Sequence, residues 1–224
     1  MIVSAIVLAA GNGKRMGADI PKQFLKIDGE MVLTRTLRVF QESPEIRDIV
    51  LVTGEEWVSF CRDEIVDKEG FSKIRHVIAG GKERYDSAYA GILACPNSDY
   101  VFIHDGARPF ITEEILKRTL EEVVKHPAVA VGVPSKDTVK IVDQDGFVTD
   151  TPPRKNVWNI QTPQAFSYSL IRSAYEIVRE EGMTDITDDA MVVEASGLSR
   201  VRLVMGEYTN IKITTPDDLA CMKK

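Results

Sequence analysis

Apolar runs rich in valine and isoleucine alternate along the chain with longer amphipathic segments. The runs lie at residues 5–9, 49–53, 74–79, 100–104 and 128–133. Strands buried on both faces read as such near-continuous apolar runs, so the pattern predicts parallel strands. The segments with helical spacing between them are 32–40, 55–66, 84–93 and 112–125. The alternation predicts an α/β fold with a mostly parallel, doubly wound sheet.

The segment 112–125 shows the helical pattern in detail. Thr112 is placed to cap the helix, because its hydroxyl can accept from an unpaired N–H of the first turn. The residues expected on its apolar face are Ile115, Leu116, Leu120, Val123 and Val124. Such a face predicts packing against the sheet.

The pattern changes after Pro134. The stretch KDTVKIVDQDGFVTDTPPRK alternates polar and apolar residues and carries an Asp145-Gly146 turn signal, which predicts a β-hairpin or arm over about residues 135–156. Two interpretations stay open, a simple edge hairpin and an arm that forms a homodimer. The chain then returns through a strand at 157–161, helices near 168–180 and 188–196, a strand at 201–204 and a last helix from residue 216. We expect residues 1–224 to form one domain with this arm.

Composition and charge exclude several classes of function. The chain has 224 residues and a net charge of −6, which argues against broad binding to nucleic acid or an anionic membrane surface. Its cysteines, Cys61, Cys95 and Cys221, are widely spaced and odd in number, so neither a disulfide framework nor a zinc site is expected. No apolar run approaches the ~20 residues that span a bilayer. A cytoplasmic protein is the expectation.

The loop after the first strand is the clearest chemical signal, within LAAGNGKRMGADIPKQF at residues 8–24. It is not the dinucleotide fingerprint, because Met16 stands where that pattern needs glycine. It is not a P-loop either, because Leu8 and Arg15 depart from that motif. The residues that supply backbone freedom or positive charge are Gly11, Gly13, Lys14, Arg15 and Lys22. Exposed N–H groups and cations favour the anionic oxygens of a phosphate-bearing ligand, with a solvated basic loop as the alternative.

Seven motifs in this order are more specific than any single element. They are AAGNGKRMGADIPKQF, GGKERYDS, HDGARPF, DTVKIV, NIQTPQAF, TDDA and NIKITTPDDL. Together they resemble the 2-C-methyl-D-erythritol 4-phosphate cytidylyltransferases of the non-mevalonate isoprenoid pathway. The resemblance implies a Rossmann-like fold of the nucleotide-diphospho-sugar transferase type and transfer of CMP from CTP to methylerythritol phosphate, with release of pyrophosphate. It also implies a homodimer, and Mg²⁺ held mainly through the CTP phosphates, with no side chain assigned as a metal ligand.

The resemblance assigns roles to particular positions. The implied CTP-binding residues are Ala9, Ala10, Gly11, Asn12, Gly13, Lys14, Gly80, Gly81, Ser87, Asp105 and Gly106. The implied substrate-binding residues are Asp105, Arg108, Thr138, Arg154, Thr162, Thr187 and Lys212. The implied catalytic residues are Arg15, Lys22, Arg154 and Lys212. If the arm is exchanged between subunits, Arg154 serves the partner's site.

Two departures and two alternatives belong to this assignment. Lys82 stands where relatives often carry an acidic residue, which puts a magnesium-handling carboxylate there in doubt, and Gly106 replaces a common alanine.

A ribitol 5-phosphate cytidylyltransferase would share the fold, the loop and the chemistry. A catalytically silent CTP-binding module would keep the pocket without turnover.

Overall fold

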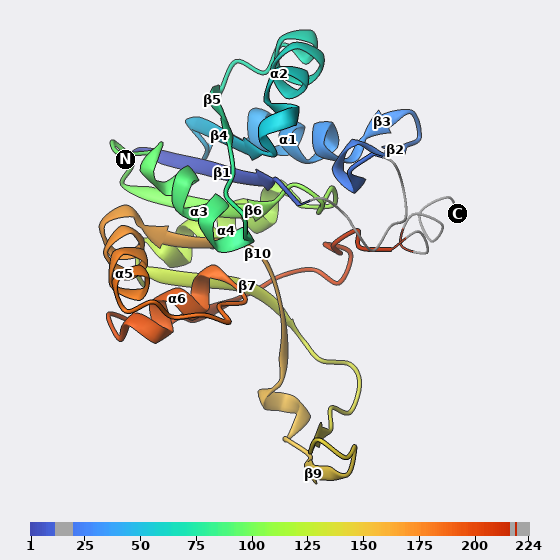
Figure 1. The fold of residues 1–224 in the computed structure, drawn as a ribbon, viewed down its shortest axis with the longest axis vertical. Coiled ribbons are helices and arrows are strands. Elements are labelled where there is room, and N and C mark those ends of the chain that lie inside the picture. The colour runs from blue at the N-terminus through green and yellow to red at the C-terminus, as the bar shows by residue number, and fades with distance from the viewer. Residues whose placement is uncertain (12–19, 216–217, 219–224) are drawn as a thin grey trace.

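The computed structural model describes residues 1–11, 20–215 and 218 of the chain. Within this part, a central sheet has seven strands in the order β11-β7-β10-β6-β1-β4-β5 (Figure 1). Strand β10 pairs antiparallel with β6 and β7, whereas the remaining neighbours in the sheet pair in parallel. The predicted mostly parallel α/β fold is confirmed.

The sheet strands lie close to the predicted apolar runs. Their bounds are β1 Val3–Ala9, β4 Asp48–Thr53, β5 Ile74–Ala79, β6 Tyr100–Asp105, β7 Ala128–Pro134, β10 Trp158–Ser167 and β11 Arg202–Met205. A short hairpin that the pattern did not predict consists of β2 Lys26–Ile27 and β3 Glu30–Met31. Its turn contains Asp28 and Gly29, both with positive φ. Strand β10 extends beyond the expected 157–161, with a shift of register between Ile160 and Gln164.

The helices cover both faces of the sheet. Their bounds are α1 Val32–Glu42, α2 Val58–Phe60, α3 Arg84–Leu93, α4 Glu113–Val123, α5 Tyr168–Glu180 and α6 Asp189–Ser196. Strand β1 shows the layering: Val3, Ala5 and Val7 face a core shared with α1 and α4. Ile6 and Leu8 face a second core shared with α3, α5 and α6. The alternation of side chains across a strand thus places β1 at the centre of three layers.

Two helical expectations need correction. The segment 55–66 is not one α-helix: it runs through 3-10 helix η3 Glu55–Trp57, then α2, then π-helix η4 Cys61–Asp67. In α4, Thr112 caps the helix as predicted, accepting from the N–H of Ile115. Val124, however, is 52% exposed and not part of the apolar face, because the helix ends at Val123. The expected last helix from residue 216 lies largely outside the described residues.

The segment between β7 and β10 projects from the sheet as an arm (Figure 1). It carries a separate two-stranded sheet, β8 Ile141–Val142 and β9 Val148–Asp150, and ends in the 3-10 helix η5 Arg154–Asn156. Residues 136–151 are exposed throughout. Residues 136–151 of the arm therefore contribute nothing to the two cores on the faces of the sheet. None of the described helices is both long and apolar enough to cross a membrane.

Candidate active site

A cavity of about 360 Å³ opens at the carboxyl ends of β1 and β6. This is the edge at which ligands bind in open α/β sheets. Residues lining the cavity are Leu8, Ala9, Ala10, Gly11, Lys22, Gln23, Gly81, Lys82, Glu83, Arg84, Ser87, Asp105, Ala107 and Lys212. The structure thus brings together three segments that the sequence motifs singled out, namely the start of the glycine loop, the GGKERYDS turn and the end of β6.

The start of the glycine loop is fastened by a residue that the motifs did not single out. Gln23 is buried, and its side-chain amide donates to the carbonyls of Ala9 and Gly11. It belongs to the 3-10 helix η2 Lys22–Phe24. Lys22 is therefore held close to the end of β1, at the wall of the cavity. Asn12, Gly13, Lys14 and Arg15 lie outside the described residues.

The second wall of the cavity is the turn that begins α3. The N–H of Gly81 donates to the Ser87 hydroxyl at 3.1 Å, and that hydroxyl donates to the carbonyl of Glu83 at 3.2 Å. A Cβ added at Gly80 would lie 2.5 Å from Ser87 Oγ and 2.8 Å from Ala10 Cβ. Only glycine fits where this turn meets the glycine loop.

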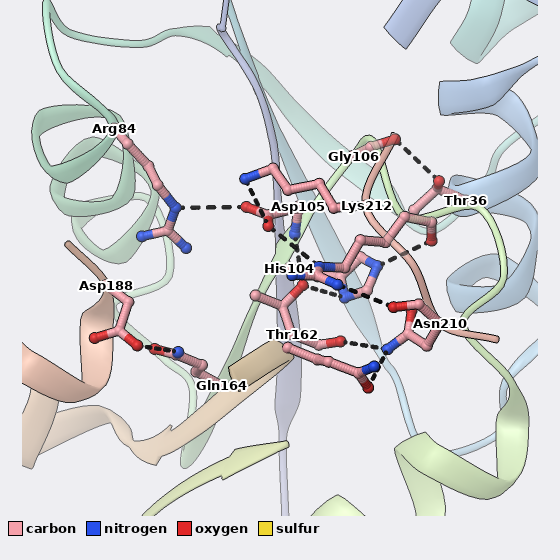
Figure 2. Close-up of polar contacts among 12 residues, drawn as sticks. Thr36, Arg84, His104, Asp105, Gly106, Thr162, Gln164, Asp188, Asn210 and Lys212 are labelled. Carbon is pink, nitrogen blue, oxygen red and sulfur yellow. Dashed lines mark hydrogen bonds and ion pairs between the residues drawn. The ribbon is translucent and has the colours of Figure 1, made fainter. Parts of the chain in front are cut away.

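Asp105 lies at the centre of the charged part of the cavity (Figure 2). Its Oδ1 accepts from Arg84 Nε at 3.4 Å, and its Oδ2 accepts from Arg108 Nε at 3.3 Å and from Lys212 Nζ at 3.0 Å. Burial alone would raise the pKa of Asp105, but Arg84, Lys212 and Arg108 outweigh burial and hold that pKa well below its usual range. Asp105 is therefore ionised and holds the side chains of Arg84, Arg108 and Lys212 close together.

A hydrogen-bonded relay fixes the backbone of Asp105. Its N–H donates to Thr162 Oγ1 at 3.0 Å, and the same oxygen lies 3.0 Å from His104 Nδ1. His104 Nε2 lies 3.4 Å from the carbonyl of Arg108. The neutral tautomer with the proton on Nε2 satisfies all of these groups, since Thr162 then donates to Nδ1 and Nε2 donates to the carbonyl. The Thr162 hydroxyl is thus engaged beneath the cavity, and His104 is a structural residue.

The segment that carries Lys212 is tied to the end of β6. Arg108 Nη1 donates to the carbonyl of Asn210 at 2.9 Å, and the N–H of Ile213 donates to the carbonyl of Ala107. The buried Asn210 amide donates to the carbonyl of Thr162 at 2.9 Å. Asn210 is a further positioning group that single motifs did not reveal, because its partners lie far away in the sequence.

Three of the implied substrate-binding residues lie away from the cavity. Thr138 and Arg154 are exposed on the arm, where Arg154 Nη1 donates to the carbonyl of Lys136. Thr187 is exposed just before α6. Gly80, Gly106, Arg108 and Thr162 support the cavity without lining it. Among the described residues, the structure therefore brings part of the implied nucleotide side together at the cavity and leaves Thr138 and Arg154 of the arm outside it.

Comparison with known proteins decides the family. The family model for 2-C-methyl-D-erythritol 4-phosphate cytidylyltransferase matches residues 3–223. The chain belongs to this family. The protein of that name from Geotalea uraniireducens is 50% identical over 98% of this chain and 94% of its own. The one from Lachnospira eligens is 46% identical over 96% of this chain and 95% of its own.

Solved structures agree with this assignment. The 4-diphosphocytidyl-2C-methyl-D-erythritol synthase of Anaerococcus prevotii has a TM-score of 0.87 and 38% identity, covering 99% of this chain and 94% of its own. The Francisella tularensis 2-C-methyl-D-erythritol 4-phosphate cytidylyltransferase has a TM-score of 0.82 and 28% identity, over 100% and 99% of the two chains. As a member of the 2-C-methyl-D-erythritol 4-phosphate cytidylyltransferase family, the chain is a nucleotidyltransferase of isoprenoid biosynthesis that uses CTP. Neither the ribitol 5-phosphate enzyme nor the silent module is favoured by these matches.

Proposed function

We propose that this chain transfers CMP from CTP to 2-C-methyl-D-erythritol 4-phosphate in the cavity at the end of β1 and β6, forming 4-diphosphocytidyl-2-C-methyl-D-erythritol and pyrophosphate. The observation that supports this location is the meeting of Arg84 and Lys212 on Asp105, in a cavity that Lys22 and the start of the glycine loop also line. Two polyanions approach each other in this reaction, so a cavity lined with cations lowers their mutual repulsion.

The chemistry requires no enzyme nucleophile. A non-bridging oxygen of the methylerythritol phosphate attacks the α-phosphorus of CTP, the new P–O bond forms, and the bond to pyrophosphate breaks with its electron pair leaving on pyrophosphate. A phosphate monoester is already ionised near neutral pH, so no base is needed. The task of the protein is positioning and charge stabilisation. We assign Arg15 and Lys22 to the charge that develops on the phosphates of CTP, and Lys212 to the orientation of the attacking phosphate.

We assign the remaining nucleotide contacts as the resemblance to the family implies. We assign residues 9–14 to the triphosphate, and Gly80, Gly81 and Ser87 to the cytosine and ribose end. We assign Asp105 and Gly106 to CTP, and Asp105 and Arg108 to the substrate side, with Arg108 Nε donating to Asp105 Oδ2 at 3.3 Å. Thr162 and Thr187 remain assigned to the substrate side, with the Thr162 hydroxyl already bound to the N–H of Asp105.

Magnesium is the cofactor that the reaction class favours. Among the described residues, no group of three histidine, cysteine or acidic side chains is arranged to hold a metal ion. Asp105 has both oxygens engaged by cations. The part of the chain that the structure describes therefore offers no protein cage for the ion. We propose that Mg²⁺ is held mainly through the CTP phosphates, since Mg²⁺ keeps several waters and needs few protein ligands.

The arm is proposed to form a homodimer. Its exposed apolar side chains include Ile141, Val142, Phe147 and Val148, and Phe147 is 72% exposed. A short two-stranded sheet with such side chains is stabilised when a partner covers it. In that dimer, Thr138 and Arg154 would reach the partner's cavity and hold the sugar phosphate. The chain is then one catalytic domain with an arm. We place it in the reducing cytoplasm, and the free, buried thiols of Cys61 and Cys95 are compatible with that compartment.

Mixing two impaired variants tests the exchange of the arm, at a sugar-phosphate concentration low enough that Arg154→Ala alone releases little pyrophosphate. In a mixed dimer of Lys22→Met and Arg154→Ala, one site would combine Lys22 of one subunit with Arg154 of the other. Random reassortment is then expected to restore about a quarter of the wild-type pyrophosphate release, because half of the dimers carry one intact site. No restored activity in a mixture shown to contain mixed dimers would place Arg154 in the site of its own subunit or outside the site.

A further inference from the structure

Arg84 has no role in the assignments above, yet it connects the cavity to the protein interior. It is the first residue of α3 and lines the cavity. Its Nε donates to Asp105 Oδ1 at 3.4 Å, and its Nη2 donates to Asp189 Oδ2 at 2.8 Å. A single guanidinium thus bridges a carboxylate at the end of β6 and a carboxylate at the start of α6. This use of the planar fork is specific to arginine.

The Nη2 atom of Arg84 is anchored in the core through its contact with Asp189. Asp189 is fully buried, and its Oδ1 accepts from the Tyr175 hydroxyl at 2.6 Å. Tyr175 stacks on Tyr85 and on Tyr89, with ring centroids 5.0 Å and 5.7 Å apart. If Arg84 moved away to a phosphate, the buried carboxylate of Asp189 would lose its cation, which is strongly unfavourable. The pairing with Asp189 therefore holds Arg84 in place, with its Nε next to Asp105 Oδ1.

The contact of Arg84 Nε with Asp105 Oδ1 determines which carboxylate oxygen is left to accept from Lys212. Lys212 contacts Oδ2 and Arg84 contacts Oδ1 (Figure 2). Arg108 also contacts Oδ2. Without a partner on Oδ1, the carboxylate is free to rotate and exchange its oxygens. Lys212 is 35% exposed on a flexible stem, so its direction in the cavity depends on a fixed acceptor.

We propose that Arg84 is a positioning residue of the transfer reaction: anchored on Asp189, it fixes Asp105 so that Lys212 is directed into the cavity. This inference rests on the proposed function, because Lys212 is assigned there to the attacking phosphate. Arg84 then contributes to turnover through Lys212 and not through direct contact with CTP.

The test is a double-mutant cycle on pyrophosphate release with CTP and methylerythritol phosphate. We expect Arg84→Met to lower kcat about tenfold or more in the wild-type background, with less than about threefold change in KM for CTP. In the Lys212→Met background, the same substitution is expected to lower kcat less than about twofold, because the group it positions is already absent. Equal losses in the two backgrounds would overturn the proposal. A raised KM for CTP at unchanged kcat would also overturn it, since Arg84 would then bind nucleotide directly.

Conservative and compensating variants separate positioning from charge balance. Arg84→Lys keeps the charge but cannot bridge both carboxylates, so we expect a folded protein that has lost most of its kcat. In Arg84→Met with Asp189→Asn, no uncompensated buried charge remains, and this double variant replaces Arg84→Met in the cycle if the single variant does not fold. It is expected to stay slow, because Asp105 still lacks its Oδ1 partner. Recovery of wild-type kcat in this double variant would reduce Arg84 to a counter-ion of Asp189 and refute the proposal.

A matched control is available on a neighbouring helix. Arg179 in α5 pairs with Asp86 at 2.9 Å and lies over the ring of Tyr89, but it does not line the cavity. Arg179→Met removes an arginine from the same aromatic cluster and is expected to keep kcat within about twofold of wild type. A loss as large as that of Arg84→Met would contradict a specific role for Arg84. If the wild-type chain itself releases no pyrophosphate, the proposed function fails first, which is a distinct outcome.

Discussion

The folded protein is expected to lose stability between pH 7.5 and pH 5, because His104 takes up a proton in this range only when the chain unfolds. The ring is fully buried, packs 5.0 Å from the ring of Phe40, and has hydrogen-bond partners at both nitrogens. Burial lowers the pKa of His104 from 6.5 to about 3, with Asp105 opposing the change and Arg108 adding to it. The folded state therefore keeps this histidine neutral at a pH where the unfolded chain protonates it.

The sign and size of the effect follow from linkage. The folded pKa is depressed, so the unfolded state binds the proton first and stability is lost as pH falls below about 6.5. With a pKa of about 3 in the folded state, the loss between pH 7.5 and pH 5 is about 2 kcal/mol. The depressed pKa of Asp105 acts in the same direction, but only near and below its ordinary value of 3.8. The chosen window therefore separates the effect of His104 from that of Asp105.

Urea unfolding at the two pH values measures this loss, and a variant corrects for all other groups. His104→Asn keeps an acceptor for the Thr162 hydroxyl and cannot titrate. We expect the variant to be less stable at pH 7.5 and to lose about 2 kcal/mol less than wild type on going to pH 5. Equal losses in the two proteins would refute the buried neutral histidine, and with it the relay that holds Asp105.

Further predictions concern the cavity and the arm. Lys22→Met is expected to lower kcat by about 10²–10³-fold while the protein stays folded, because a donor to the developing charge is lost; near-normal turnover removes Lys22 from the mechanism. Arg15→Met should behave in the same way. Arg154→Ala is expected to raise KM for the sugar phosphate more than KM for CTP, and the reverse order would move Arg154 to the nucleotide side. Gly80→Ala is expected to raise KM for CTP, because its Cβ would displace Ala10 and Ser87; unchanged kinetics would show that the turn relaxes without touching the site.

The sequence pattern predicted elements whose burial is simple. Strands such as β1 and β4 are apolar on both faces, so their runs are continuous and easily recognised. The second half of β10, residues 162–167, was missed because Thr162 and Gln164 are polar yet buried. Their hydrogen bonds are tertiary: Gln164, for example, donates to Asp188 at 2.8 Å and accepts from the N–H of Ala190. No periodicity within the strand reveals such partners.

The same distinction applies to the site. The glycines and cations of the loop are close together in the sequence, so they predict phosphate binding without knowledge of the fold. The order of the seven motifs identifies the family. Arg84, Gln23 and Asn210 were not singled out, since each acts through a contact made only after folding. Arg84 and Asp189, for instance, are 105 residues apart in the chain. A buried aspartate at the end of a strand requires counter-ions, so the arginine in the preceding motif GGKERYDS was the available signal.

The most direct test is pyrophosphate release by the wild-type protein with CTP and Mg²⁺, comparing methylerythritol phosphate and ribitol 5-phosphate in one preparation. We expect a large preference in kcat/KM for methylerythritol phosphate. A preference for ribitol 5-phosphate would contradict the proposed substrate and the roles given to Thr138, Arg154 and Thr187.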